Sequence, residues 1–469
     1  MRAVVVGGSI AGSMAALTLA RAGWAVTLVE RDPLPLDTGP EGAWAAWPRP
    51  SVPQTGHSHN FYARIRSELR AELPDVLDRL MDAGVEEVRI TDHAPAAVRD
   101  QLDAAACADL IALAARRGVF EWALSRAAED ETGVERRTAD VSGITYDGGA
   151  VSGVVVDGEP IAADLVVDAS GRRTRADAWF AAVGLAPAGW ESSECGVGYH
   201  TRYYRYRPGV ARPPLSRGFG GGANFPTHVV VTFPADRDTY SVTVGTPPWL
   251  DECRALREPE VFESLLQLSP ASLPWSEQGA GEPITDVRVM AGLNNSIRRR
   301  MIDEPAPAGF VATGDAAMHT NPAAARGVSV AVLGALRLAR IASQAPDRSA
   351  LAEAWSRELG ELASYYFDDV VQRDRERAEV WGATWSGRAP DILEVRPGVR
   401  FVDVVAATMV DAEVWTQFQR GVNLLDEPAT AWSEPIAAKV RELKAAGRLP
   451  TPPEPPSTDA VLAALTASR

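Results

Sequence analysis

The hydrophobic pattern of the N-terminus predicts a strand, a turn, a helix and a second strand. Three valines, residues 4–6, lead into a turn from Gly7 to Gly12, and an alanine-rich segment follows. A second apolar run, residues 26–29, ends at Glu30, which lies 18 residues after Gly12. This order of elements is typical of a βαβ unit that binds a dinucleotide.

The residues of this N-terminal unit have expected tasks. Gly7 would allow the tight turn after the strand, and Gly12 would allow the helix to pack closely on the sheet. The free N–H groups at the start of the helix would receive a pyrophosphate, and Glu30 would accept hydrogen bonds from the adenosine ribose. Ser9 replaces the usual middle glycine, so a glycine turn of an unrelated α/β protein is the alternative. The predicted cofactor-binding residues here are Gly7, Ser9, Ile10, Ala11, Gly12, Glu30 and Arg31.

Further along the chain the hydrophobic period changes. Helical spacing predicts helices over residues 61–84 and 104–129. Between residues 135 and 167 apolar and polar positions alternate around glycine turns, which predicts an antiparallel meander leading into a buried strand. Strand-like runs from about 190 to 290 predict a second sheet. The pattern becomes helical again after Pro322 and in a charged stretch from 350 to about 378.

Composition and charge narrow the class of protein. The 469 residues, with 46% hydrophobic and 23% charged side chains, suit a large globular enzyme of more than one unit. A net charge of −15 argues against nucleic acid or an anionic membrane, so we expect small-molecule partners. Three scattered cysteines and the lack of ligand spacing predict no disulfide and no metal site. With no apolar leader and no run of about 18 apolar residues, we expect a cytoplasmic protein without a membrane span.

Two further motifs place an aspartate and a glycine turn at the end of an apolar strand. The first spans residues 163–175 and ends with three arginines, and the second spans 309–327. An aspartate at a strand end can accept from ribityl or ribose hydroxyl groups, and a helix N-terminus can stabilise negative charge on a reduced ring. These roles suit a flavin. The predicted cofactor-binding residues of the two motifs are Asp168, Gly171, Gly314, Asp315 and Gly327.

Taken together, the three motifs resemble those of the FAD-dependent monooxygenases with the p-hydroxybenzoate hydroxylase fold. The residues Val-Val-Asp-Ala-Ser-Gly-Arg at 166–172 are more similar to the epoxidase-like and halogenase-like branches. The resemblance implies an α/β fold with a GR2-type, Rossmann-like FAD-binding domain, an inserted β-sheet substrate domain and C-terminal helices. The implied segments are 1–180 and 286–345 for the FAD-binding domain, 181–285 for the substrate domain and 346–469 for the helical region.

The resemblance also implies a reaction. Such enzymes insert one oxygen atom, by hydroxylation or epoxidation, into an apolar substrate such as a natural product, through a flavin C4a-hydroperoxide. The implied cofactor is FAD and the co-substrate molecular oxygen, with NAD(P)H as electron donor, directly or through a separate flavin reductase. Arg117, or Arg116 in a shifted register, would support the FAD phosphates. The candidates for lining the substrate cavity are Phe225, Trp249, Tyr203 and Tyr240.

The catalytic candidates are three residues that follow the Gly314-Asp315 motif: His319, Pro322 and Arg326. Pro322 would border the oxygen site, and His319 is an acid-base candidate because of its place in the flavin loop. Only one of the two glycines usual in this loop is present, so Ala325 would approach the ring and Arg326 would add positive charge near its N1 and O2 atoms. His57 and His59 are more simply explained as cap or loop hydrogen-bonding groups.

Other flavin chemistry on the same scaffold stays open. A reductase, dehydrogenase or cyclase would bind FAD in the same way without consuming oxygen in step with product, and a non-catalytic FAD-binding protein is a further alternative. A flavin-dependent halogenase is less favoured, because such enzymes carry a Trp-x-Trp-x-Ile-Pro signature and a lysine that captures the hypohalous species. The tryptophans at 381 and 385 do not form that signature.

The electron supply is the first testable prediction. Because the chain has no second dinucleotide fingerprint, we expect NAD(P)H alone to reduce the flavin slowly, and substrate or a flavin reductase to accelerate the reduction. Anaerobic stopped-flow absorbance measures this rate. Rapid bleaching by NADPH alone would contradict the prediction and would favour a phosphate site at Arg172, Arg173 and Arg175.

Overall fold

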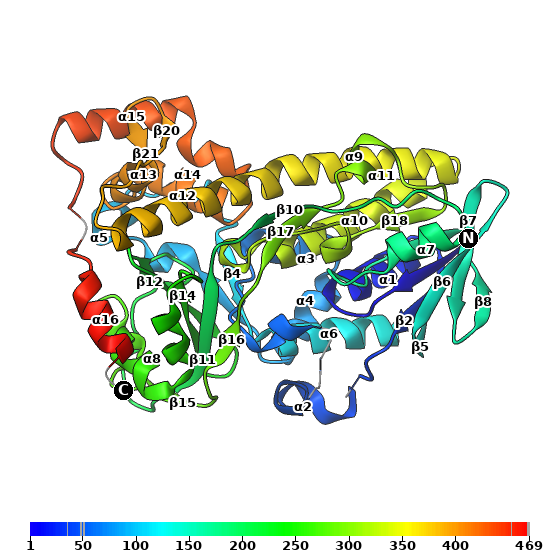
Figure 1. Ribbon diagram of the computed structural model, residues 1–469, viewed down its shortest axis with the longest axis horizontal. Coiled ribbons are helices and arrows are strands. Elements are labelled where there is room, and N and C mark those ends of the chain that lie inside the picture. Colours follow the sequence, from blue (N-terminus) through cyan, green and yellow to red (C-terminus); the bar gives the residue numbers. More distant parts are fainter. Residues whose placement is uncertain (35, 47–48, 50–51, 452, 467–469) are drawn as a thin grey trace.

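A five-stranded parallel sheet forms the centre of the computed structural model, which describes residues 1–469 except 35, 47–48, 50–51, 452 and 467–469. Its strand order is β18-β9-β1-β2-β5, so segments far apart in sequence lie side by side (Figure 1). The strands are β1 (Arg2–Val6), β2 (Ala25–Glu30), β5 (Val134–Thr138), β9 (Leu165–Asp168) and β18 (Phe310–Ala312). Because all five are parallel, their carboxyl ends meet at one edge of the sheet.

Both faces of this sheet are covered, as the apolar run of β1 predicts. Ala3 and Val5 face a core shared with helices, whereas Val4 and Val6 face a second core shared with the antiparallel meander. The covering helices include α1 (Ile10–Arg21), α3 (Ala63–Glu72), α4 (Pro74–Asp82), α6 (Arg117–Asp130) and α10 (Gly327–Gln344). The meander consists of β6 (Val141–Asp147), β7 (Ala150–Val156) and β8 (Glu159–Ala162).

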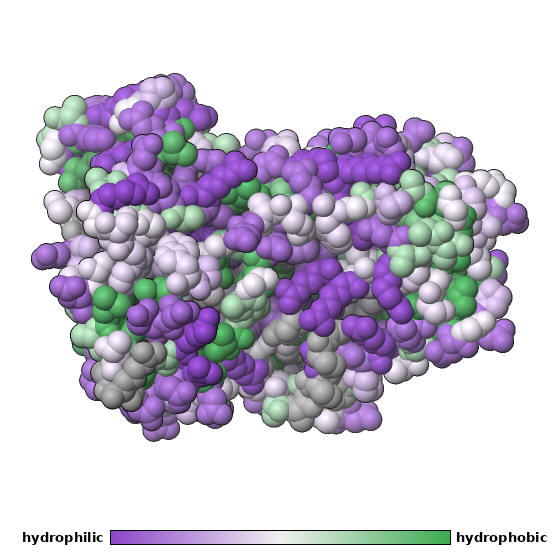
Figure 2. Space-filling view, in the orientation of Figure 1, coloured by the Kyte–Doolittle hydropathy of each residue, from purple (hydrophilic) through white to green (hydrophobic). Residues whose placement is uncertain are grey.

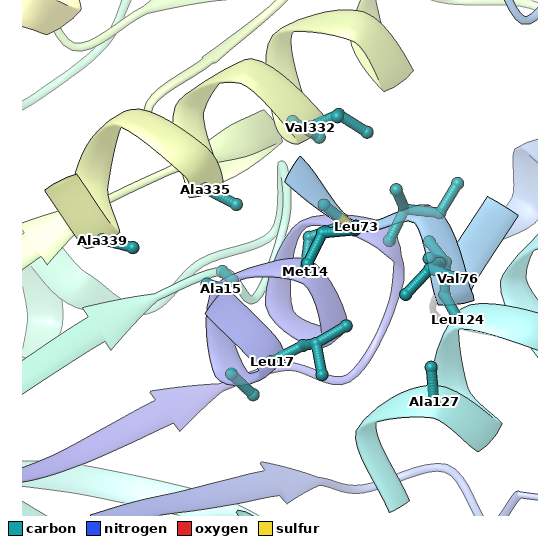
Figure 3. Close-up of a cluster of buried hydrophobic side chains, with 14 of the residues drawn as sticks. Met14, Ala15, Leu17, Leu73, Val76, Leu124, Ala127, Val332, Ala335 and Ala339 are labelled. Atoms are coloured by element: carbon teal, nitrogen blue, oxygen red, sulfur yellow. The ribbon is translucent and has the colours of Figure 1, made fainter. Parts of the chain in front are cut away.

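Small residues let α1 and α10 pack closely together. Ala15 of α1 lies in the same buried cluster as Ala335 and Ala339 of α10, and Figure 3 shows these side chains between the two helices. The hydroxyl of Thr18 donates to the carbonyl of Ala335 at 3.2 Å, which ties the backbones together. The helices follow two strands of one parallel sheet, so their N-termini lie at the same edge.

A second sheet stands beside the first. Its strand order is β12-β13-β14-β11-β15, with β16 also paired to β11. The strands are β11 (Gly198–Tyr206), β12 (Gly221–Asn224), β13 (Val229–Ala235), β14 (Thr239–Thr246), β15 (Gly281–Pro283) and β16 (Arg288–Met290). A third, three-stranded sheet consists of β10 (Glu191–Glu194), β17 (Asn294–Ile297) and β19 (Met318–His319). In chain order β10 precedes the second sheet, and β17 and β19 follow it. One face of the second sheet packs on α8 (Pro259–Leu266).

The C-terminal region is helical. A long rod of α11 (Arg348–Leu362), a π-helical segment (Ala363–Phe367) and α12 (Asp368–Trp385) spans the molecule in Figure 1. It ends beside a group of shorter elements: β20 (Glu394–Arg396), β21 (Val399–Arg400), α13 (Phe401–Ala407), α14 (Ala412–Val422) and α15 (Glu434–Ala445). The last helix, α16 (Thr458–Thr466), packs on α8. The remaining α-helices and β-strands of the described chain are α2 (Gly39–Ala46), β3 (Glu86–Arg89), α5 (Ala96–Arg99), β4 (Ile111–Ala114), α7 (Ala176–Ala182) and α9 (Arg300–Asp303).

Several sequence predictions of secondary structure are wrong in detail. The predicted helix over 104–129 contains the strand β4, and the helix begins only at Arg117, because a short apolar run fits a strand and a helix equally well. Residues 134–138 join the parallel sheet rather than the meander. The helix expected from 350 to 378 is interrupted by the π-helical segment. The helix expected at Pro322 is a short 3-10 turn, and α10 begins at Gly327.

The surface carries no large apolar band on the face that Figure 2 shows, where hydrophilic residues predominate and hydrophobic residues form small separate areas. Within the described ranges, no helix is long and apolar enough to cross a membrane.

The close approach of α1 to the glycine turn generates a stability prediction. A Cβ on Gly12 would lie 1.7 Å from the carbonyl oxygen of Gly7, so Gly12→Ala forces the helix away from the turn. We expect the free energy of unfolding in urea to fall by about 1–3 kcal/mol or more. Gly382→Ala is the matched control, because a Cβ added to that helical glycine would meet no neighbouring atom within 4 Å and alanine there should be neutral or stabilising. Equal stability of the two variants would contradict the close packing.

Candidate functional site

One cavity opens at the carboxyl edge of the parallel sheet and extends to the second sheet. The ends of β1, β2 and β9 and the turn after β18 contribute to its wall, and so do the starts of α1 and α10. The structure therefore brings together most of the residues that the sequence singled out. Those that line the cavity are Gly7, Ser9, Ile10, Ala11, Glu30, Arg31, Arg117, Gly171, Asp315, His319, Pro322, Arg326 and Gly327.

Three of the predicted cofactor-binding residues lie behind the wall instead. Gly12 lies in the first turn of α1 against the carbonyl of Gly7, and Gly314 has φ +56° and lies close to Ala11. The carboxylate of Asp168 is fully buried and accepts from the backbone N–H of Ser170 at 3.0 Å and from the hydroxyl of Thr174. Burial raises the pKa of Asp168, and these hydrogen bonds oppose that shift. Asp168 therefore holds the turn that presents Gly171, and it does not line the cavity.

The start of α1 forms one end of the cavity. Gly7 has φ +99°, and a Cβ there would lie 2.5 Å from the carbonyl oxygen of Ala169, so the turn requires glycine. Arg117, the first residue of α6, donates to the hydroxyl of Ser9 at 3.1 Å and thus places a positive charge beside the free N–H groups of α1. Arg116 instead forms ion pairs with the buried carboxylate of Asp236 and the exposed carboxylate of Glu41. The register that faces the cavity is therefore that of Arg117.

Glu30 lies at the neighbouring strand end. Its carboxylate is 5% exposed and accepts from the backbone N–H groups of Gly8 at 2.6 Å and Asp32 at 2.9 Å. Arg49 lies 3.7 Å from Glu30 and 2.8 Å from the buried carboxylate of Glu121. Sequence analysis missed Arg49, because a single arginine in a proline- and tryptophan-rich loop has no spacing that marks it.

Asp315 and His319 lie at the other end, after β18. Asp315 lines the cavity, and its carboxylate forms no ion pair with any described residue. The carboxylate of Asp168, by contrast, accepts hydrogen bonds from Ser170 and Thr174. Burial lowers the pKa of His319, although Asp315 opposes the shift. The Nδ1 atom of His319 is buried, and within the described part of the chain it has no hydrogen-bond partner. Asp315 is thus a group of the wall that is open to a ligand, whereas the Nδ1 atom of His319 has almost no accessible surface.

The loop before α10 places its side chains differently from the sequence expectation. Ala325 has φ +51° and lines the cavity, as expected for the position usually held by glycine. The guanidinium of Arg326, however, donates to the carbonyl of Tyr366 at 3.0 Å and pairs with the carboxylate of Asp369. Its charge is therefore offset inside the protein. The first N–H groups of α10, at Gly327 and Val328, face the cavity instead.

Two more histidines line the cavity in the neutral form. Burial lowers the pKa of His57 to about 4 and that of His59 to about 3, and nearby arginines add to both shifts. The Nδ1 of His59 bonds to the carbonyl of His57 at 2.9 Å, and its Nε2 lies 3.2 Å from a nitrogen of Arg117. His59 thus orients Arg117, and the simpler structural explanation of this histidine fits the geometry.

Three apolar side chains contribute to the cavity wall nearest the second sheet, beside polar residues such as His57 and Asn294. Phe233 of β13, Met290 of β16 and Leu293 line it, and none of them was predicted. The four aromatic candidates were wrong: Phe225, Trp249, Tyr203 and Tyr240 are absent from the described lining. Strand alternation explains Tyr240, because that residue points to the face of β14 that packs on α8, while Ser241 and Thr243 point to the other.

Comparison with known proteins agrees with this geometry. Residues 2–152 match the model of the FAD dependent oxidoreductase family (DAO). The match covers the N-terminal motif and supports FAD as cofactor and an oxidoreductase as the class of protein. Protein Rv3254 of Mycobacterium tuberculosis is 29% identical over 369 residues, which are 72% of each chain.

Solved structures share the fold at low sequence identity. The flavin-dependent brominase Bmp2 has a TM-score of 0.59 at 16% identity, over 95% of this chain and 100% of that chain. PqsL of Pseudomonas aeruginosa, a probable FAD-dependent monooxygenase, has a TM-score of 0.58 at 15% identity, over 82% and 99%. The flavin-dependent halogenase CmlS has a TM-score of 0.56 at 18% identity, over 95% and 77%. The chain therefore shares the α/β fold of these solved structures, with a parallel Rossmann-like core and additional sheets and helices.

The residues present fit FAD. A glycine turn and the start of α1, with Arg117 beside them, offer donors for a pyrophosphate, and Glu30 and Asp315 supply carboxylates on either side. The start of α10 adds a second helix N-terminus in the same cavity. In the ranges that the structure describes, no group of three or more histidine, cysteine or acidic side chains could hold a metal ion.

The unpaired carboxylate of Asp315 generates a binding prediction. Loss of charge-assisted hydrogen bonds, each worth about 1.5–3 kcal/mol, should weaken FAD binding about ten-fold or more in Asp315→Ala. Fluorescence titration of the apoprotein with FAD measures the dissociation constant. Asp303→Ala, at an exposed site on α9, is the control and should bind FAD like the unmodified protein. Unchanged affinity in Asp315→Ala would reduce Asp315 to a turn residue.

Proposed function

We propose that the protein is an FAD-dependent monooxygenase that inserts one oxygen atom into an apolar substrate. The observation that carries this proposal is that one cavity joins a dinucleotide-type wall, with Glu30, Arg117 and Asp315, to a wall at the second sheet that presents Phe233, Met290 and Leu293. Bound FAD would supply the redox chemistry and activate molecular oxygen. We expect this chemistry in the cytoplasm, with NAD(P)H as electron donor, directly or through a separate flavin reductase.

The residues of the chain would bind FAD and would shield the substrate from water. Arg117 and the start of α1 would hold the pyrophosphate, and the start of α10 would stabilise negative charge on the reduced ring. Phe233, Met290 and Leu293 would offer an apolar surface to an aromatic ring or an alkene and would exclude water from it. Pro322 and His319 also line the cavity, and the imidazole of His319 is the acid-base candidate of this wall.

The lysines of the chain argue against halogenation. The chain contains only two lysines, Lys439 and Lys444, and both lie on α15. Lys439 pairs with Glu413, and Lys444 pairs with Asp403 at 2.8 Å. Neither lines the cavity. A halogenase mechanism that needs a lysine beside the substrate therefore has no candidate here, which favours direct oxygen transfer over the activity of the halogenase neighbours.

The proposal is tested with chemically reduced holoprotein, so that the natural electron donor is not needed. Mixed with 18O-labelled oxygen and a panel of apolar aromatic and alkene compounds, the protein should form a product heavier by one labelled oxygen atom. Oxygen uptake should match product formation, and apoprotein is the control. A halogenated product in the presence of bromide or chloride would contradict the proposal. So would reduction or cyclisation of a substrate without oxygen uptake.

A further inference from the structure

The loop between β19 and α10 holds a conformation that its sequence does not favour. Ala325 lies in the left-handed region at φ +51°, which costs free energy for any residue with a Cβ. The loop includes Pro322, lines the cavity and ends where α10 begins. Its shape therefore has to be held by contacts with other elements.

The first set of contacts fastens the start of the loop to α12. Asp374, which is 5% exposed, accepts from the side-chain amide of Asn321 at 2.8 Å and from that of Asn295 at 2.7 Å. The side-chain carbonyl of Asn295 in turn accepts from the backbone N–H of Asn321 at 2.7 Å. The hydroxyl of Tyr199 donates to Asn321 and accepts from the backbone N–H of Ala323 at 3.1 Å. Asn321 and Asn295 are both fully buried, so these bonds do not compete with water.

The second set fastens the end of the loop to the same helical rod. Arg326 pairs with Asp369 of α12 and donates to the carbonyl of Tyr366, which lies in the π-helical segment. Burial alone would raise the pKa of Asp369, but Arg373 and Arg326 lower it, so the carboxylate stays charged. Single π-helical turns within α-helices are often found at functional sites. Between the two fastenings, the hydroxyl of Tyr62 donates to the carbonyl of Ala324 at 3.0 Å.

We propose that Asp374 and Asp369 are positioning residues, which clamp the loop 321–326 so that Ala325 and the first N–H groups of α10 meet the edge of the flavin ring. This inference rests on the proposed function, because it assumes FAD in the cavity. The two carboxylates reach the loop from one rigid rod, at sites five residues apart in α12. Asp369 has a second effect, because it offsets the charge of Arg326 and leaves the helix N-terminus as the positive group that faces the ring.

The clamp is tested with Asp374→Asn and Asp369→Asn, each of which keeps the side-chain shape and removes the charge. Because charge-assisted hydrogen bonds are lost, we expect the dissociation constant of FAD to rise about ten-fold. The visible absorption bands and the midpoint potential of bound FAD should also shift, which a purely structural role would not cause. Asp368→Asn is the matched control, because its carboxylate is the exposed neighbour that pairs with Arg299 on the surface, and it should change none of these values.

The strained alanine provides a second variant. Ala325→Gly removes the conformational cost, so in the Asp374→Asn background it should recover most of the lost FAD affinity. If Asp374→Asn does not fold, Tyr199→Phe removes one hydroxyl from the same anchor and should weaken FAD binding and shift its spectrum less. The clamp would be overturned if Asp369→Asn, and also Asp374→Asn or Tyr199→Phe, kept the FAD affinity, absorption spectrum and midpoint potential of the unmodified protein. The proposed function would not be affected by that result. Failure of the unmodified protein to bind FAD would overturn the proposed function itself.

Discussion

The close contact between α1 and α10 is the constraint on which the rest of the site depends. Alanine at positions 15, 335 and 339 lets the two helices approach until Thr18 reaches a carbonyl of the neighbouring helix. Because each helix follows a strand of the same parallel sheet, the approach sets both N-termini into one cavity. A larger side chain at this contact would separate the two positive helix ends that the cavity combines.

The cavity contains several positively charged side chains although the whole chain is negatively charged. The protein carries a net charge of −15, yet Arg31, Arg49 and Arg117 line the cavity. The buried carboxylate of Glu121 holds two of these arginines in place, because it lies within 3.3 Å of both Arg49 and Arg117. Because both partners are shielded from water, such pairs orient the arginine firmly.

The two sheets line different ends of the cavity. The parallel sheet supplies strand ends and helix starts, which provide backbone N–H groups and carboxylates. The second sheet supplies a wall of apolar side chains, such as Phe233, and its outer face is buried under α8. The loop 321–326 lies where the two meet, and Asp374 and Asp369 of α12 hold it.

Short-range patterns in the sequence determined the first strand, turn, helix and second strand, the aspartate motifs at 168 and 315 and the second sheet, because these features depend on residues close together in the chain. The sequence predicted 16 site residues, and the cavity brings 13 of them together. Only the tertiary structure decided that Asp168 lies behind the wall, that Arg326 turns toward Asp369, and that Arg49 and Phe233 line the cavity. The physical reason is that burial and ion pairing depend on which distant elements meet, and those contacts have no signature in local spacing.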